Sequence, residues 1–115
     1  MTTSPTPTRF VDTQTTRLSP AALDPDQVVD GRPAVALAAF AELGGVEVGV
    51  WEHSAGGSRD VEAAEVFLVL SGAATLTFDT GERVELVPGR LVRLHAGENT
   101  TWEVRETLRK VYVTV

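Results

Sequence analysis

The chain has 115 residues, of which 43% are hydrophobic and 23% are charged, values typical of a single globular domain. Its net charge is -6 and its basic residues are scattered, apart from Arg109 and Lys110, which argues against binding to nucleic acid or to an anionic membrane. The absence of cysteine excludes disulfides, thiolate nucleophiles and thiolate-bound metals.

The N-terminal residues, 1–17, predict a flexible arm, because they are rich in threonine and proline and show no periodicity. They contain no basic start followed by an apolar stretch, so we expect no signal peptide. No apolar run in the sequence approaches the length of a membrane span. We therefore expect a cytoplasmic protein with a single folded domain over residues 18–115.

Residues 18–31 predict an irregular connector with one short helical turn at most, because Ser-Pro, Asp-Pro and Asp-Gly pairs interrupt the segment. The following run, PAVALAAFAELGG, is ambiguous. Its alanines favour a helix, whereas its short length and its two apolar faces are typical of a buried strand. Taken alone, this pattern gives helix a slight advantage.

From Val46 onward the pattern predicts short strands separated by glycine turns. The expected strands cover residues 46–53, 65–70, 74–78, 83–87 and 91–95, followed by TTWEV and the terminal LRKVYVTV. We expect residues 56–60 to form a flexible loop that lacks the context of a phosphate-binding loop. Many short strands without intervening helices predict an antiparallel sandwich or small barrel, whose interior is the expected place for a ligand.

Two spaced motifs in this region resemble those of the cupin superfamily. Glu65 is followed after six residues by Gly72, and Gly89 is followed by five residues and then by His95, Ala96 and Gly97. Three further segments are GVWE at 49–52, TWEV at 101–104, and Arg109, Lys110 and Tyr112. They resemble segments of a more specific group, the small single-domain cupins related to ureidoglycine aminohydrolase and the ethanolamine-utilisation cupin. The resemblance covers the chain from Gly31 to its end.

The resemblance implies an all-β fold, a conical β-barrel of the jelly-roll or double-stranded β-helix type. Such barrels consist of two antiparallel sheets, carry a pocket at the wider end and are usually homodimers. The resemblance also implies that residues 33–43 form a strand, and we adopt this prediction because a closed sheet needs strands and both faces of the run are apolar.

At the family's metal-binding positions this sequence departs from the pattern. A metal-binding cupin carries two histidines shortly before the glutamate and a third histidine three residues after the glycine of the second motif. The corresponding residues are Ser58 with Asp60, or Arg59 with Val61, and then Thr100. Because imidazole-bound metals need several nitrogen donors, we expect a degenerate metal site and no cofactor. The alternative is a divalent metal bound weakly through Glu65 and histidines.

Glu65 is the central candidate for function, because the family's glutamate points into the barrel. It could act as a general acid or base together with His95 or His53, or it could anchor an amine or hydroxyl of a ligand. The structural alternative is a carboxylate satisfied by Arg59 or by backbone donors.

The candidate ligand-binding residues surround Glu65 in the expected barrel. Phe67 shares its parity along the strand, and Thr100 and Trp102 share one face of a later strand, where the indole would form an apolar wall. Arg59 and Arg93 could hold a carboxylate or phosphate through bidentate contacts.

Three functions follow as hypotheses. The first is a cupin that binds a small polar metabolite around Glu65. The second is a metal-independent acid/base enzyme of the isomerase, cyclase, lyase or hydrolase type. The third is a dimeric accessory or sensory subunit, because the terminal strand is expected to form an open edge that invites pairing with a second copy.

Overall fold

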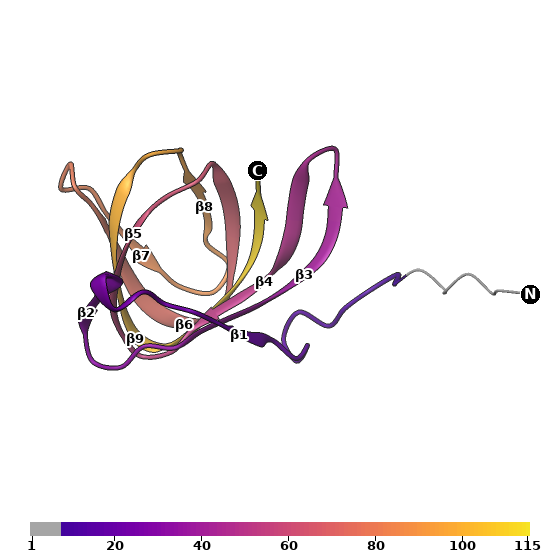
Figure 1. Cartoon of the computed structure of the whole chain (residues 1–115), viewed down its shortest axis with the longest axis horizontal. Coiled ribbons are helices and arrows are strands. Elements are labelled where there is room, and N and C mark those ends of the chain that lie inside the picture. The colour runs from indigo at the N-terminus through magenta and orange to yellow at the C-terminus, as the bar shows by residue number, and fades with distance from the viewer. Residues whose placement is uncertain (1–7) are drawn as a thin grey trace, which may run out of the picture.

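The computed structural model describes residues 8–115, and their regular structure is almost entirely β, as predicted (Figure 1). The strands are β1 (Ser19–Ala21), β2 (Val28–Asp30), β3 (Val35–Leu43), β4 (Val46–His53), β5 (Gly56–Val61), β6 (Glu65–Phe78), β7 (Arg83–Leu86), β8 (Leu91–Leu94) and β9 (Asn99–Thr114), and a short 3₁₀ helix, η1, covers Pro25–Gln27. Of the predicted arm, residues 1–7 lie outside the described residues.

The sheet is organised around its two longest strands, β6 and β9. They pair antiparallel along almost their whole length, with Glu65 opposite Thr114 and Phe78 opposite Thr100. On its other edge, β9 pairs with β5 through its first half and with β4 through its second half. The other edge of β6 pairs with β8 and then β7. Both long strands bend, so the sheet curls into an open barrel (Figure 1).

The bend in β6 lies at Gly72. The backbone of Gly72 has a φ of +99°, and a Cβ at this position would overlap the carbonyl oxygen of Thr107 on β9. The pairing of the two strands shifts register around this point. The predicted break at Gly72 is therefore wrong: residues 65–78 form one continuous bent strand, because only glycine lets the two backbones approach so closely.

The terminal residues of the chain lie inside the sheet. Residues 108–114 of β9 pair with β4 on one side and with β6 on the other. The prediction of an open edge strand at the C-terminus is therefore wrong. An alternating terminal strand resembles an edge in sequence, and only the pairing reveals its central place.

Two further segments of the chain are also strands. Residues 35–43 form β3, which pairs antiparallel with β4, as the family resemblance implied. Residues 56–61 form β5 and not the predicted flexible loop, because β9 supplies hydrogen-bonding partners along this segment. The connector forms β1 beside β3, then η1, then β2 beside β5, so it runs across the barrel between these two strands (Figure 1).

The concave side of the sheet holds the hydrophobic core. Its buried residues come mainly from β6, β8 and β9 and include Phe67, Leu76, Leu94, Trp102 and Leu108. The alternation of the strands directs these side chains inward. At one end the core gives way to a polar cavity next to the connector, and this cavity forms the candidate site.

Candidate ligand-binding site

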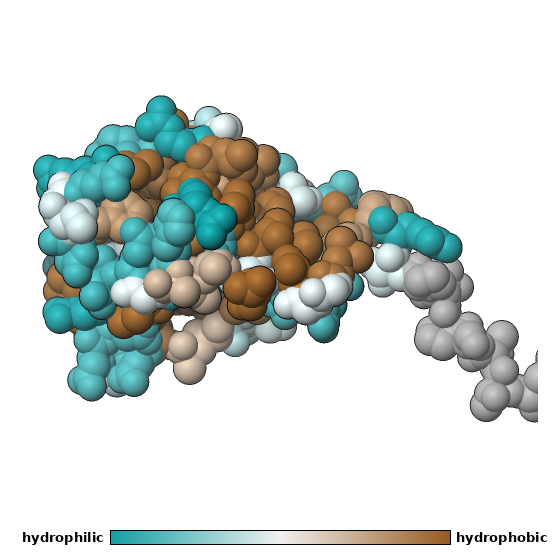
Figure 2. All heavy atoms as spheres, turned by 90° about the horizontal axis from the view of Figure 1, so that it is seen from above, coloured by the Kyte–Doolittle hydropathy of each residue, from teal (hydrophilic) through white to brown (hydrophobic). Residues whose placement is uncertain are grey.

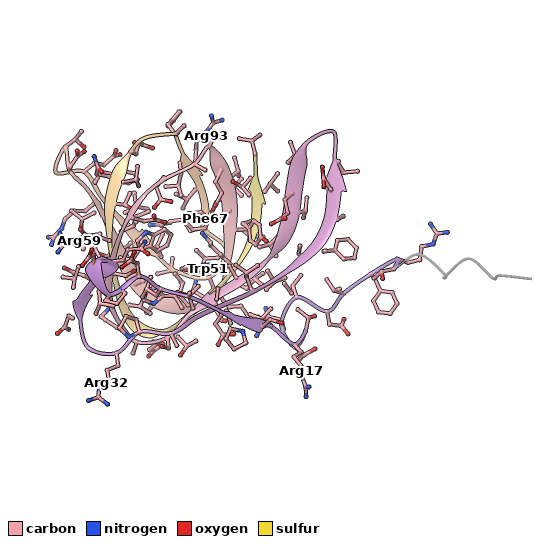
Figure 3. The ribbon with its side chains drawn as sticks, in the orientation of Figure 1. Arg17, Arg32, Trp51, Arg59, Phe67 and Arg93 are labelled. Carbon is pink, nitrogen blue, oxygen red and sulfur yellow. The ribbon has the colours of Figure 1, made fainter. Side chains whose placement is uncertain are left out.

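The barrel contains a cavity of about 340 Å³, lined by residues of β4, β5, β6 and β9 and closed on one side by the connector. Apolar and aromatic surface is contributed by Trp51 and Trp102, and the polar residues include Asp60, Glu65 and Lys110. Figure 3 shows Trp51 and Phe67 in the barrel interior. A concave pocket with aromatic walls and a few convergent polar groups is typical of small-molecule sites.

Lys110 provides a buried cation at the centre of this cavity. Its ammonium donates to the Glu65 carboxylate over 2.7 Å, and the side chains are only 5% and 14% exposed, respectively. The same nitrogen lies 4.3 Å from the ring centre of Trp51, 4.2 Å from that of Phe67 and 4.8 Å from that of Trp102. The ammonium is thus held by one carboxylate and three aromatic faces.

Burial and neighbouring charges act on Lys110 in opposite directions. Loss of hydration lowers the pKa of its ammonium, whereas the nearby carboxylates of Glu65, Glu62 and Asp60 oppose this effect. The lysine therefore holds its proton less firmly than an exposed lysine, and its charge depends on the carboxylates around it.

A second buried acid, Glu62, adjoins this pair. Its carboxylate accepts hydrogen bonds from the Thr100 hydroxyl at 2.5 Å and the Trp102 indole N–H at 3.1 Å. Burial raises the pKa of Glu62, and the negative charge of Asp60 acts in the same direction. Burial also raises the pKa of Asp60. The cavity therefore contains carboxyl groups that are more easily protonated than usual.

His53 and Ser58 form a further buried polar pair on the cavity wall. The Nε2 atom of His53 lies 2.8 Å from the Ser58 hydroxyl, and its Nδ1 atom lies 2.6 Å from the main-chain carbonyl oxygen of Ser54. His53 is 1% exposed and Ser58 is 4% exposed. Burial lowers the pKa of His53, which favours the neutral imidazole.

The structure brings together some of the predicted site residues and separates others. Glu65, His53, Arg59 and Trp102 line the cavity. Phe67 lies beneath the Lys110 ammonium, and Thr100 binds Glu62 while also lining a neighbouring cavity of about 780 Å³. His95 and Arg93 line a different depression, where the 66% exposed His95 side chain lies 3.4 Å from Glu98 (Figure 3 shows Arg93 at the barrel rim).

Sequence reasoning missed Lys110 and Glu62 as members of the site. Glu65 was expected to bind Arg59 or backbone donors if it was structural, and its partner is Lys110 instead. The available signal was alternation: Lys110 has the same parity as Tyr112 and Thr114, all three of which line the cavity. Glu62 follows Asp60 by two residues, and no comparable pattern in the sequence indicated that it belongs to the site.

The residues at the family's metal-binding positions do not fit a metal. Glu65 binds Lys110, Ser58 binds His53 and Thr100 binds Glu62. One carboxylate oxygen of Asp60 accepts from the backbone N–H of Val61. Within residues 8–115, no group of three or more His, Cys, Asp or Glu side chains is placed to hold a metal ion. The Lys110 ammonium also repels a second cation near Glu65.

Comparison with known proteins agrees with this architecture. The model of the EutQ-like cupin domain matches residues 40–112. A protein of unknown function from Pseudomonas syringae pv. tomato superposes with a TM-score of 0.77 at 19% identity, covering 87% of this chain and 45% of its own. The present chain thus spans less than half of that protein. No curated protein matches the sequence.

Two solved structures carry the name of the ethanolamine-utilisation protein. EutQ of Clostridium difficile has a TM-score of 0.63 at 19% identity, covering 82% of this chain and 79% of its own. A putative ethanolamine utilization protein Q from Salmonella typhimurium has a TM-score of 0.63 at 17% identity, covering 87% and 96%. At these identities the likeness concerns the fold alone.

Proposed function

The chain belongs to the EutQ-like cupin domain family, and on that premise we propose that it binds a small polar metabolite in the barrel cavity around Glu65. The supporting observation is the Glu65–Lys110 pair, which places an acceptor and a donor side by side against aromatic walls. A cavity of about 340 Å³ is at the lower end of the range of small-molecule sites.

The charges of the cavity favour one class of ligand. Glu47, Asp60, Glu62 and Glu65 line it together with the cations Arg59 and Lys110. Acidic groups are in excess, so hydroxyl and amine groups of a ligand would find acceptors, whereas a strongly anionic ligand would meet repulsion. We therefore propose a neutral or cationic ligand with several hydroxyl or amino groups.

The experiment is a thermal-shift screen of small polyols, amino alcohols and amines against the wild type and Glu65→Gln. We expect a hit to raise the melting temperature of the wild type with increasing concentration and to lose most of this effect in Glu65→Gln. Glu82→Gln, at an exposed position outside the cavity, is the matched control and should keep the full shift. A shift that persists unchanged in Glu65→Gln would contradict the proposal.

Metal-independent acid/base catalysis is the second candidate function, and Glu62 favours it. A buried carboxyl with a raised pKa is suited both to donating a proton to a ligand and to accepting one from it. His53 and Glu65 line the same cavity, although no hydrogen bond joins these two described side chains. The test is to follow each hit of the screen by NMR for conversion. Turnover that is lost in Glu62→Gln would support an isomerase, cyclase, lyase or hydrolase.

Assembly into a homodimer is the third element of the proposal and underlies the accessory or sensory alternative. Figure 2 shows apolar surface extending from the barrel to the base of the arm. The exposed large hydrophobic residues include Phe10, Leu43 and Val115, which are 75%, 69% and 72% exposed. Light scattering coupled to gel filtration tests the assembly, and a monomer at high concentration would contradict it.

A cytoplasmic location and the absence of nucleic-acid and membrane partners remain predictions from sequence. Within residues 8–115, no helix has the length and apolar character needed to span a membrane.

A further inference from the structure

The hydrogen bonds of His53 fix which ring nitrogen carries the proton. Its Nδ1 atom faces the carbonyl oxygen of Ser54 at 2.6 Å, and a carbonyl oxygen can only accept. Nδ1 must therefore be protonated. The neutral ring then presents a lone pair at Nε2, and the Ser58 hydroxyl, 2.8 Å away, donates to it. A serine hydroxyl whose proton points at an imidazole lone pair is the arrangement of an activated nucleophile.

The pair is buried and faces the cavity. His53 ends β4 and Ser58 lies in β5, and both line the cavity wall. The Trp51 ring centre lies 5.6 Å from that of His53. The Ser54 carbonyl orients the imidazole as a carboxylate does in serine hydrolases, although without a full negative charge. Burial keeps the ring neutral, so Nε2 is available as a base.

We propose that Ser58 is a nucleophile, activated by His53, that takes up the acyl group of a small ester entering the cavity. The Ser58 oxygen forms a bond to the ester carbonyl carbon while its proton passes to Nε2 of His53. The ester C–O bond then breaks, and the leaving alcohol takes that proton. Water attacks the acyl-serine with His53 again accepting a proton, which releases a carboxylic acid and restores Ser58.

The negative charge that develops on the carbonyl oxygen requires a donor or cation nearby. Lys110 lines the same cavity, and its positive charge acts on His53. Its ammonium is the candidate for stabilising this charge. The same positive charge disfavours protonation of the His53 ring. The cavity volume of about 340 Å³ restricts the substrate to short acyl groups.

The test is covalent labelling of the full chain with diisopropyl fluorophosphate, followed by peptide mass spectrometry. The serine oxygen bonds to phosphorus, the P–F bond breaks, and fluoride leaves together with the serine proton. We expect one label per chain on Ser58, no label in Ser58→Ala, and labelling at least about 100-fold slower in His53→Gln. Acetylation of Ser58 by p-nitrophenyl acetate should follow the same pattern.

Ser19→Ala is the matched control, because it removes an exposed serine hydroxyl in β1 that does not line the cavity. It should be labelled like the wild type. Unlabelled Ser58 in the folded wild type, or equal labelling of Ser54, would overturn the proposal. Since His53→Gln could unfold, the tautomer is measured independently in the wild type by ¹⁵N NMR of the imidazole. A protonated Nε2 would also overturn it.

The proposed nucleophile is a function beyond ligand binding, and each of the two proposals can be contradicted without the other. A ligand shift that depends on Glu65 would stand even if Ser58 were never labelled. Conversely, labelling of Ser58 in Glu65→Gln would establish the nucleophile without the binding function.

Discussion

The Lys110 ammonium donates to the Glu65 carboxylate over 2.7 Å, from the neighbouring strand and inside the barrel. The cupin pattern places a metal-binding glutamate at this position, and here the opposite charge is a lysine attached to the chain. An amino group that belongs to the protein and is paired with this carboxylate makes the cavity polar without requiring a metal. It also makes the stability of the barrel depend on both partners.

Removing one partner of this pair should destabilise the protein more than removing both. Lys110→Met leaves a buried carboxylate without its cation, and we expect a loss of about 3–5 kcal/mol in the free energy of unfolding. The double variant Lys110→Met/Glu65→Gln should therefore lose less stability than Lys110→Met alone. Chemical denaturation of the four proteins measures the coupling. Additive single effects would contradict a functional ion pair at this site.

Glu62 should make the stability of the protein fall as pH rises above the ordinary carboxyl range. Its pKa is raised in the folded state, so between pH 4.5 and the raised value the folded chain binds more protons than the unfolded chain. The stability contributed by the protonated form is therefore present below this window and is lost as pH increases through it. At pH values above this window, the Glu62 carboxylate is ionised in the folded protein as well.

Glu62→Gln isolates this effect, because the glutamine oxygen can still accept from Thr100 and Trp102. The melting temperature of Glu62→Gln minus that of the wild type should increase as pH rises from 4.5. Glu82→Gln, which removes an exposed charge, controls for the change in net charge. A difference that decreases with pH would show that the Glu62 carboxylate is better stabilised than its burial indicates.

The sequence predicted most of the fold because alternation and glycine turns act locally. Residues 46–53 form the expected strand, and the cupin resemblance resolved residues 35–43 correctly against their helix propensity. The errors lie where the local structure depends on backbone from a distant part of the chain. Residues 56–61 form a strand because β9 lies beside them, and Gly72 bends a strand instead of ending it because Thr107 lies against it.

The candidate site was less accessible to sequence reasoning. Glu65 was placed by the motif, but its partner Lys110 follows it by 45 positions, and a lysine in an alternating strand normally indicates a solvent-facing position. His95 stood within a motif, yet it lies at the rim in a separate depression. The contact between His53 and Ser58 depends on how β4 leads into β5. Because a loop was predicted in place of β5, the sequence did not reveal this contact.

Gly72 should be far less tolerant of substitution than Gly81, although both have positive φ, +99° and +95° respectively. A Cβ at Gly81 meets nothing within 4 Å, whereas one at Gly72 also lies 2.7 Å from Cα of Leu108. Gly81→Ala should cost about 1–2 kcal/mol from backbone conformation alone. Gly72→Ala should cost at least about 2 kcal/mol more or prevent folding. Denaturation curves of both variants decide this, and similar losses would contradict the close approach of β6 and β9.

Arg109 should hold the described part of the N-terminal arm against the barrel. Its guanidinium donates to the carbonyl oxygens of Thr13 and Thr16 at 2.9 and 2.5 Å, and it pairs with Glu52 at 2.9 Å. Loss of roughly 1.5 kcal/mol of charged hydrogen bonding would raise the detached population of the arm about tenfold. Arg109→Ala should therefore be cleaved by trypsin after Arg17 about tenfold faster than the wild type, if the arm opens and closes faster than it is cut.

Glu52→Gln separates anchoring of the arm from the ion pair. It removes the charge that Arg109 faces but leaves both bonds to the arm in place, so cleavage after Arg17 should stay close to the wild-type rate. Arg109→Lys should resemble Arg109→Ala, because a single ammonium cannot reproduce the fork of donors that binds two carbonyls and a carboxylate together. Unchanged cleavage in both Arg109 variants would mean that the arm is held instead by its apolar residues Phe10 and Val11, which line a groove together with Phe40 and Val48 of the sheet.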